Sequence, residues 1–131
     1  MRFPNETEVG YYLRKRAKKM HELSLCNEMI HTLEDLMEKE SLSKIEEVTV
    51  EIGEVTGVLP RYMQECWIPA SAGTKLEGCA LKIHFVEAEA LCSSCGKEYA
   101  LKNHPSCPYC GSEKREIQKG FEFEITEIKG S

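Results

Sequence analysis

Paired cysteines constrain the fold of this chain more than any other feature. Four of its seven cysteines form two pairs of equal spacing, Cys92-Ser-Ser-Cys95 and Cys107-Pro-Tyr-Cys110, with eleven residues between the pairs. A two-residue spacing lets a tight turn point both sulfur atoms at one ion, and the glycine after each pair permits the positive φ that such turns use. The sequence therefore predicts a structural zinc site with four thiolate ligands and no open position for a substrate.

The paired cysteines are also compatible with a redox pair, an iron centre of rubredoxin type or chance spacing. A redox motif needs only one pair, and chance rarely repeats the same spacing, so zinc is favoured. The remaining cysteines, Cys26, Cys66 and Cys79, lie within or beside apolar patterns. We expect them to be small buried residues of the core.

Composition and charge narrow the function classes. Residues 1–19 contain no apolar central stretch of the secretory kind, and no apolar run approaches the roughly 18 to 20 residues that cross a bilayer. We therefore expect a cytoplasmic protein without membrane association.

Charge is unevenly distributed along the chain. Residues 1–19 carry six Lys or Arg against two Glu, a net charge of +4, which leaves 11 basic and 20 acidic residues and a net charge of −9 beyond them. This acidic body disfavours nucleic-acid binding, and the basic cluster Arg14, Lys15, Arg16, Lys18, Lys19 is expected to be a solvated helix end or a disordered arm.

Hydrophobic periodicity predicts two helices and three strands. Apolar residues recur at three- and four-residue steps from Ser24 to Lys39, as on one face of an amphipathic helix. Pro60 suits the first turn of a second helix, near residues 61–68, which Pro69 ends or kinks. Alternating patterns predict strands near residues 46–52, 81–85 and 121–126.

The cysteine pairs lie between the last two predicted strands, so we expect the metal site to belong to a segment inserted between those strands. The expected fold class is α+β, with two helices packed on a three-stranded sheet and an inserted zinc-ribbon-like module at residues 91–114.

Five segments in order resemble the HypA/HybF family of hydrogenase nickel-incorporation proteins. They are the stretch Met20-His21-Glu22-Leu23-Ser24-Leu25, the segment 50–58, Ala72-Gly73-Thr74, Glu77-Gly78 and the two cysteine pairs. The resemblance covers residues 20 to about 129. It implies a nickel metallochaperone, which is not an enzyme, with an α+β nickel-binding domain at residues 20–90 and 115–131 after an N-terminal extension of residues 1–19. It also implies delivery of Ni(II) to the large subunit of NiFe-hydrogenase with a GTPase partner of HypB type, and it leaves monomer and homodimer open.

The resemblance also implies where nickel binds. Family nickel coordination maps onto Met20, His21 and Glu22, with His21 as the side-chain ligand and the other two contributing backbone groups. Nickel(II) accepts square-planar nitrogen ligands, and a histidine in second position offers its imidazole, the terminal amine and nearby deprotonated amides. Nineteen residues precede Met20 here, so translation begins at Met20, or the leader is cleaved, or the site is built differently.

Two further function classes compete with a metallochaperone. A zinc-ribbon module that binds nucleic acid or regulates would need a basic face near the cysteines, but Lys97, Lys102, Lys114 and Arg115 are set among acidic residues. An enzyme would need an open metal position or a nucleophile paired with a base, and neither is visible. His31, His84 and His104 offer little, although His104 is a candidate extra donor beside the cysteine pairs.

Overall fold

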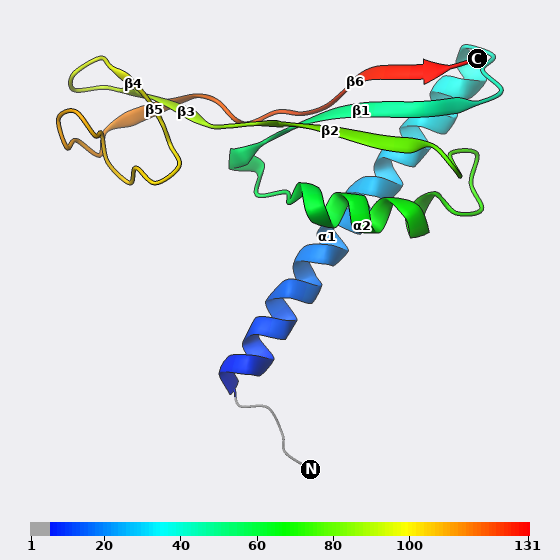
Figure 1. Cartoon of the computed structure of the whole chain (residues 1–131), viewed down its shortest axis with the longest axis horizontal. Coiled ribbons are helices and arrows are strands. Elements are labelled where there is room, and N and C mark those ends of the chain that lie inside the picture. Colours follow the sequence, from blue (N-terminus) through cyan, green and yellow to red (C-terminus); the bar gives the residue numbers. More distant parts are fainter. Residues whose placement is uncertain (1–5) are drawn as a thin grey trace. The chain divides into compact units, whose positions relative to one another are not determined.

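In the computed structural model, a helix, a strand and a second helix are followed by a run of strands (Figure 1). The structure describes the backbone of residues 6–131 and side chains from Lys19 onward. The elements in chain order are α1 (Glu6–Lys39), β1 (Ile45–Gly53), the 3-10 turn η1 (Glu54–Thr56), α2 (Pro60–Ser71), β2 (Ala80–Val86), β3 (Glu89–Cys92), β4 (Glu98–Ala100), β5 (Arg115–Lys119) and β6 (Phe123–Gly130). None of the helices, over the residues described, is long and apolar enough to cross a membrane.

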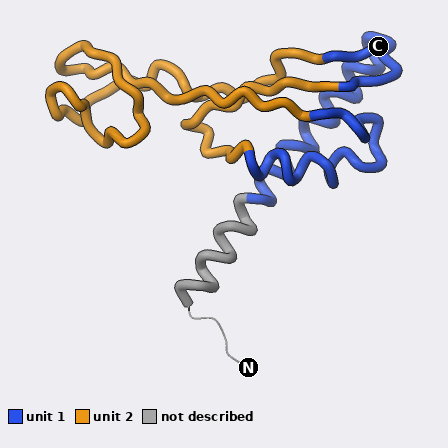
Figure 2. The backbone as a smooth tube through the Cα atoms, in the orientation of Figure 1, with its two compact units in different colours: residues 1–46, 61–80, 129–131 blue, residues 47–60, 81–128 orange. Residues whose placement is uncertain are grey.

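The polypeptide divides into two compact units (Figure 2). Unit 1 comprises residues 1–46, 61–80 and 129–131, and it contains α1 and all of α2 except Pro60. Unit 2 comprises residues 47–60 and 81–128, and it contains most of the strand residues.

The strands form two sheets of three strands each. One sheet has the order β2-β1-β6, which confirms the sheet predicted from the three alternating segments. Burial follows the same alternation, since Val48, Val50 and Ile52 on β1 are fully buried. The second sheet has the order β4-β3-β5, with β3 antiparallel to both neighbours. No periodic pattern indicated this second sheet, because its strands are only three to five residues long.

Helix α1 begins far earlier than the sequence pattern indicated. The apolar stripe predicted from Ser24 to Lys39 is confirmed, because Cys26, Ile30 and Leu33 are at most 3% exposed. The helix itself starts at Glu6. Between Glu6 and Leu23 there is no proline, and most residues are good helix formers, so the helix can extend without an apolar stripe to mark it. The side chains of the basic cluster before Lys19 lie outside the described residues.

Helix α2 is longer than predicted at its C-terminal end. Pro60 is its first residue, as expected for a residue whose missing N–H costs nothing there. The helix continues through Pro69 to Ser71, so Pro69 does not end it. Met63, Cys66 and Trp67 are buried, and the Trp67 indole Nε1 donates a hydrogen bond of 2.7 Å to the Cys79 carbonyl oxygen.

Candidate metal centres

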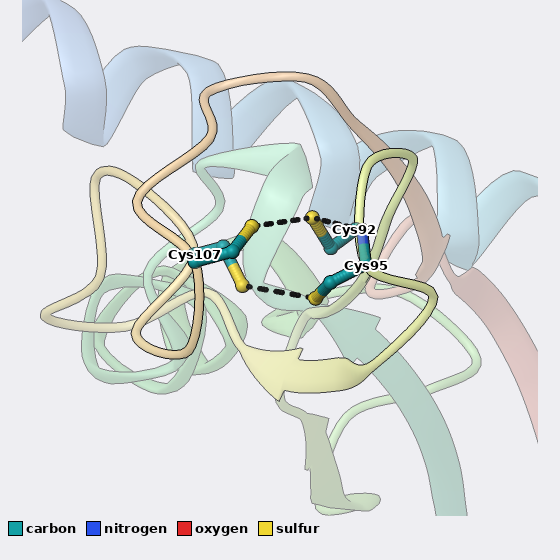
Figure 3. A group of neighbouring side chains, drawn as sticks. Cys92, Cys95 and Cys107 are labelled. Atoms are coloured by element: carbon teal, nitrogen blue, oxygen red, sulfur yellow. Dashed lines mark hydrogen bonds between the residues drawn. The ribbon is translucent and has the colours of Figure 1, made fainter.

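The structure brings the four paired cysteines together at one point. Their Sγ atoms all lie within 4.8 Å of one another. The Sγ atoms of Cys92 and Cys110 are 3.5 Å apart, and those of Cys95 and Cys107 are 3.7 Å apart. Four sulfur atoms at a Zn–S distance of about 2.3 Å from a central ion form a tetrahedron with edges of about 3.8 Å. The cluster is therefore preformed for a tetrahedral ion (Figure 3).

Backbone turns shape each cysteine pair in the same way. The N–H of Gly96 donates to the Cys92 carbonyl at 2.9 Å, and the N–H of Gly111 donates to the Cys107 carbonyl at 2.8 Å. Both glycines have positive φ, +76° and +78°, as the sequence predicted. The Ser94 hydroxyl donates to the Ser112 hydroxyl at 2.8 Å and so links the two turns.

Local hydrogen bonds and burial shift the pKa values of the cysteine thiols in different directions. The N–H of Cys95, 3.4 Å from the Cys92 sulfur, is the main group that lowers the pKa of Cys92 to about 6. Burial raises the pKa of Cys107, but N–H groups, chiefly that of Cys110, outweigh this effect and lower it. The N–H of Ser112 lowers the pKa of Cys110, whereas hydrogen bonding to Cys92 and burial raise it to about 12. The cluster thus favours thiolates at Cys92 and Cys107, and the thiolate is the form that binds metal.

The module around these cysteines has very little core of its own. Its buried cluster consists of Ala90, Cys92, Tyr99 and Cys107, with Leu101 packed against it. Two of these four residues are themselves candidate metal ligands. Below about 40 residues an apolar core seldom stabilises a fold alone, so this arrangement is typical of a module that a metal holds together.

Two basic side chains near the four cysteines contact protein groups. The Arg115 guanidinium donates to the carbonyl oxygens of His104 and Pro105 at 3.3 and 2.9 Å. The Lys97 ammonium lies 4.7 Å from the centre of the Tyr109 ring, a cation–π contact. His104 packs edge-to-face against Tyr99 with ring centres 6.3 Å apart, and it is not a member of the four-sulfur cluster.

The Met20-His21-Glu22 stretch lies well inside α1. Met20 is 61% exposed and the His21 side chain 59% exposed, whereas Glu22 is fully buried. Inside an α-helix each backbone N–H donates to the carbonyl four residues earlier. Nickel could use these amides only if the helix unwound through this turn or began at Met20.

The other two histidines outside the module lie elsewhere: His31 is exposed on α1, and His84 Nδ1 is 3.3 Å from a Glu51 carboxylate oxygen on the sheet.

Glu22 is a polar residue whose setting the sequence did not reveal. Neither of its carboxylate oxygens has a hydrogen-bond partner, and the His21 Nδ1 lies 3.7 Å from one of them. Glu22 precedes Cys26 by four residues, so both side chains occupy the same face of α1. That spacing is visible in the sequence, but the predicted apolar stripe begins only at Ser24.

The three cysteines outside the paired motifs are buried, as predicted. Burial, then the nearby Cys66 and Glu22, raises the pKa of Cys26 to about 12. Burial and the charge of Glu22 also raise the pKa of Cys66. Thiols of this kind are protonated at neutral pH and are not activated nucleophiles.

Sequence comparison gives one family over most of the chain. Residues 20–130 match the family model described as "Hydrogenase/urease nickel incorporation, metallochaperone, hypA". The hydrogenase maturation factor HybF of Morganella morganii is 30% identical over 112 residues, which cover 85% of this chain and 99% of that protein. The hydrogenase maturation factor HypA of Parabacteroides distasonis is 33% identical over 110 residues, which cover 83% of this chain and 96% of that protein.

Comparison of structures gives the same fold. The solution structure of the Ni metallochaperone HypA from Helicobacter pylori matches with a TM-score of 0.57 and 22% identity, over 83% of this chain and 96% of that one. A second solution structure, of a HypA protein, matches with a TM-score of 0.61 and 23% identity, over 86% of this chain and 97% of that one. The family match begins at Met20, so residues 1–19 lie outside it.

Proposed function

Because this chain belongs to the HypA family of hydrogenase maturation factors, we propose that it binds Ni(II) and delivers it to the large subunit of NiFe-hydrogenase. The family consists of metallochaperones and not of enzymes, and it acts in the hydrogenase maturation machinery. One observation carries the proposal: the match spans residues 20–130 and opens on the Met-His-Glu stretch.

The proposed nickel ligands are the His21 imidazole and backbone groups of Met20 and Glu22. The exposure of the imidazole supports this assignment, because cargo must be taken up and released. In a chain that starts at Met20, the terminal amine and the first amides would complete a square-planar set of nitrogen ligands. Residues 20–90 and 115–131 would form the nickel-binding domain.

The proposed resident ion of the four-cysteine cluster is zinc, held by Cys92, Cys95, Cys107 and Cys110. Four thiolates in a tetrahedral arrangement suit zinc and leave no position open for exchange with a substrate. Zinc would therefore stabilise the module of residues 91–114, whereas nickel would bind at the separate site that includes His21.

The proposed setting is the cytoplasm, and the proposed partners are a GTPase of HypB type and the hydrogenase large subunit. The partner roles rest on the family and on the chemistry of the cargo, since free Ni(II) binds many nitrogen and sulfur ligands and needs a protein route to its target.

A complementation experiment tests the proposal. In a strain that lacks its own HypA-family protein, a Met20-start form of this chain should restore hydrogenase activity and nickel in the large subunit. The His21→Ala variant should restore neither, whereas His31→Ala, a change at another exposed histidine of α1, should behave like the parent chain. Restoration by His21→Ala would refute the assigned nickel ligand, and failure of the parent chain despite normal protein levels would refute the function.

A further inference from the structure

The loop of residues 72–79, which joins α2 to β2, borders a small cavity. This loop follows α2 directly (Figure 1), and both segments belong to unit 1. The cavity has a volume of about 250 Å³, and its lining includes Trp67 and Ile68 of α2 and Ala72, Glu77 and Gly78 of the loop. None of the residues that line it is a proposed metal ligand, so the cavity is separate from both metal sites.

The helix contributes apolar atoms to this cavity. Trp67 is buried, and its indole N–H already donates to the Cys79 carbonyl oxygen, so the ring and not the N–H is left for a ligand. Ile68 is 74% exposed, which is unusual for a large apolar side chain beside a cavity. A ligand that fits here therefore brings apolar atoms to this side.

The charge at the cavity is negative. Among the described residues that line it, only Glu77 is charged, and its side chain is exposed. Among residues 19–131, no ion pair or side-chain hydrogen bond engages the Glu77 carboxylate. The C-terminal end of α2 adds partial negative charge, and its last turn has no basic residue to offset it. Lys75 belongs to the same loop but does not line the cavity. These groups together favour a cationic ligand.

The size of the cavity and its surroundings indicate what carries that cation. Sites for cofactors and drug-sized ligands have volumes of roughly 300 to 1,000 Å³, so this cavity suits a single long side chain better. Lysine and arginine combine an apolar stem with a charged head, which matches apolar walls next to a carboxylate. The exposed Ile68 favours a protein surface over a free amine, because only a larger partner would also cover that side chain. The net charge of −9 beyond residue 19 attracts a basic partner.

We propose that this cavity receives a lysine or arginine side chain of a basic partner protein. The stem of that side chain lies against Trp67 and Ile68, and its charged head lies beside the Glu77 carboxylate. No metal takes part in this contact, so the proposal stands independently of nickel binding.

The test is an NMR titration of the zinc-loaded, 15N-labelled 131-residue chain. The probes are short glycine-flanked peptides with blocked ends and a central arginine, lysine or citrulline, the last being the uncharged counterpart of arginine. We expect the arginine and lysine peptides to shift the Gly78 amide and the indole signal of Trp67, the only tryptophan of the chain. The citrulline peptide should bind roughly fivefold more weakly, as expected for loss of an exposed ion pair.

Three variants locate the contact. Glu77→Gln should reduce the affinity for the arginine and lysine peptides to that for the citrulline peptide. Glu87→Gln is the matched control, because Glu87 is also exposed but does not line the cavity, and it should leave both affinities unchanged. Ala72→Phe keeps the carboxylate but fills the cavity from an exposed position, so it should abolish the shifts. Circular dichroism checks the fold of each variant.

Four results would overturn the proposal. They are the absence of shifts with the cationic peptides, equal affinity for the citrulline peptide, unchanged affinity in Glu77→Gln, and tighter binding of free putrescine than of either cationic peptide. The last result would identify a site for small amines and not a docking site for a protein.

Discussion

Gly53 shows how a single missing side chain allows two segments to meet. At the end of β1 the Gly53 N–H donates to the Glu122 carbonyl at 2.7 Å, and the Val55 N–H donates to the Gly120 carbonyl at 2.8 Å. A Cβ atom on Gly53 would lie 2.0 Å from the Gly120 carbonyl oxygen. The hydrogen bonds that join these segments of unit 2 therefore require glycine at position 53.

The first prediction follows from this close approach. Gly53→Ala should lower the free energy of unfolding by about 3 kcal/mol, because backbone atoms must move apart and lose hydrogen bonds. Gly78→Ala is the matched control: Gly78 has φ +81°, but a methyl group there would meet no atom within 4 Å, so only backbone strain of about 1 kcal/mol is expected. Urea unfolding measures the free energy of unfolding of both variants. Equal losses of this free energy would contradict the prediction, because they would show that the backbone near Gly53 can accommodate a methyl group at little cost.

At the scale of elements, we expect the fold of the module around the four cysteines to depend on a bound ion. The β4-β3-β5 sheet carries a buried cluster of only four residues, two of them cysteines of the proposed zinc site. Without the ion, few other contacts would hold the two cysteine turns together. Helices α1 and α2, by contrast, have a larger buried apolar set that includes Ile30, Leu33 and Met63.

The second prediction is that Cys107→Ala abolishes zinc binding and loosens this module while α1, α2 and the β2-β1-β6 sheet stay folded. Tyr109→Ala is the control, because Tyr109 lies in the same turn, is 60% exposed and contributes no sulfur. It should retain one zinc per chain. Metal analysis with amide hydrogen exchange decides the matter, and a zinc-free native protein would contradict the assignment of zinc.

The sequence predicted the elements whose causes are local or periodic. The four-cysteine cluster was predictable because spacing and turn glycines lie within a few residues of each ligand. The β4-β3-β5 sheet was not, since segments such as Glu98-Tyr99-Ala100 are too short to show a period. The burial of Glu22 was also missed, because the spacing of residues along a helix does not show which polar side chain tertiary packing removes from water.

At the scale of the whole molecule, the two proposed metals have different tasks and should therefore be released at different rates. A closed thiolate shell releases zinc slowly, whereas cargo must leave within the time of a delivery step. The third prediction is that a mild chelator removes nickel from the loaded Met20-start form well before it removes zinc. The release of each metal can be followed separately by elemental analysis of the chelate fraction. Equal rates would argue against a division between structural and transported metal.

The continuity of α1 makes the start of the chain decisive for nickel chemistry. In the 131-residue form, the amides proposed as nickel ligands lie in a helix that starts at Glu6. The cluster Arg14, Lys15, Arg16, Lys18, Lys19 precedes His21 in sequence and adds positive charge near the proposed site. Both effects should weaken nickel binding through His21.

Nickel titration of three proteins tests the central claim most directly: the Met20-start form, its His21→Ala variant and the 131-residue chain. We predict that the Met20-start form binds nickel with release of protons as a diamagnetic square-planar complex. His21→Ala should lose this complex but keep zinc and fold, and the 131-residue chain should bind nickel more weakly. Equal affinity of the long and short forms would show that the amine is not a ligand, and unchanged affinity in His21→Ala would contradict the account by removing the nickel site from this position.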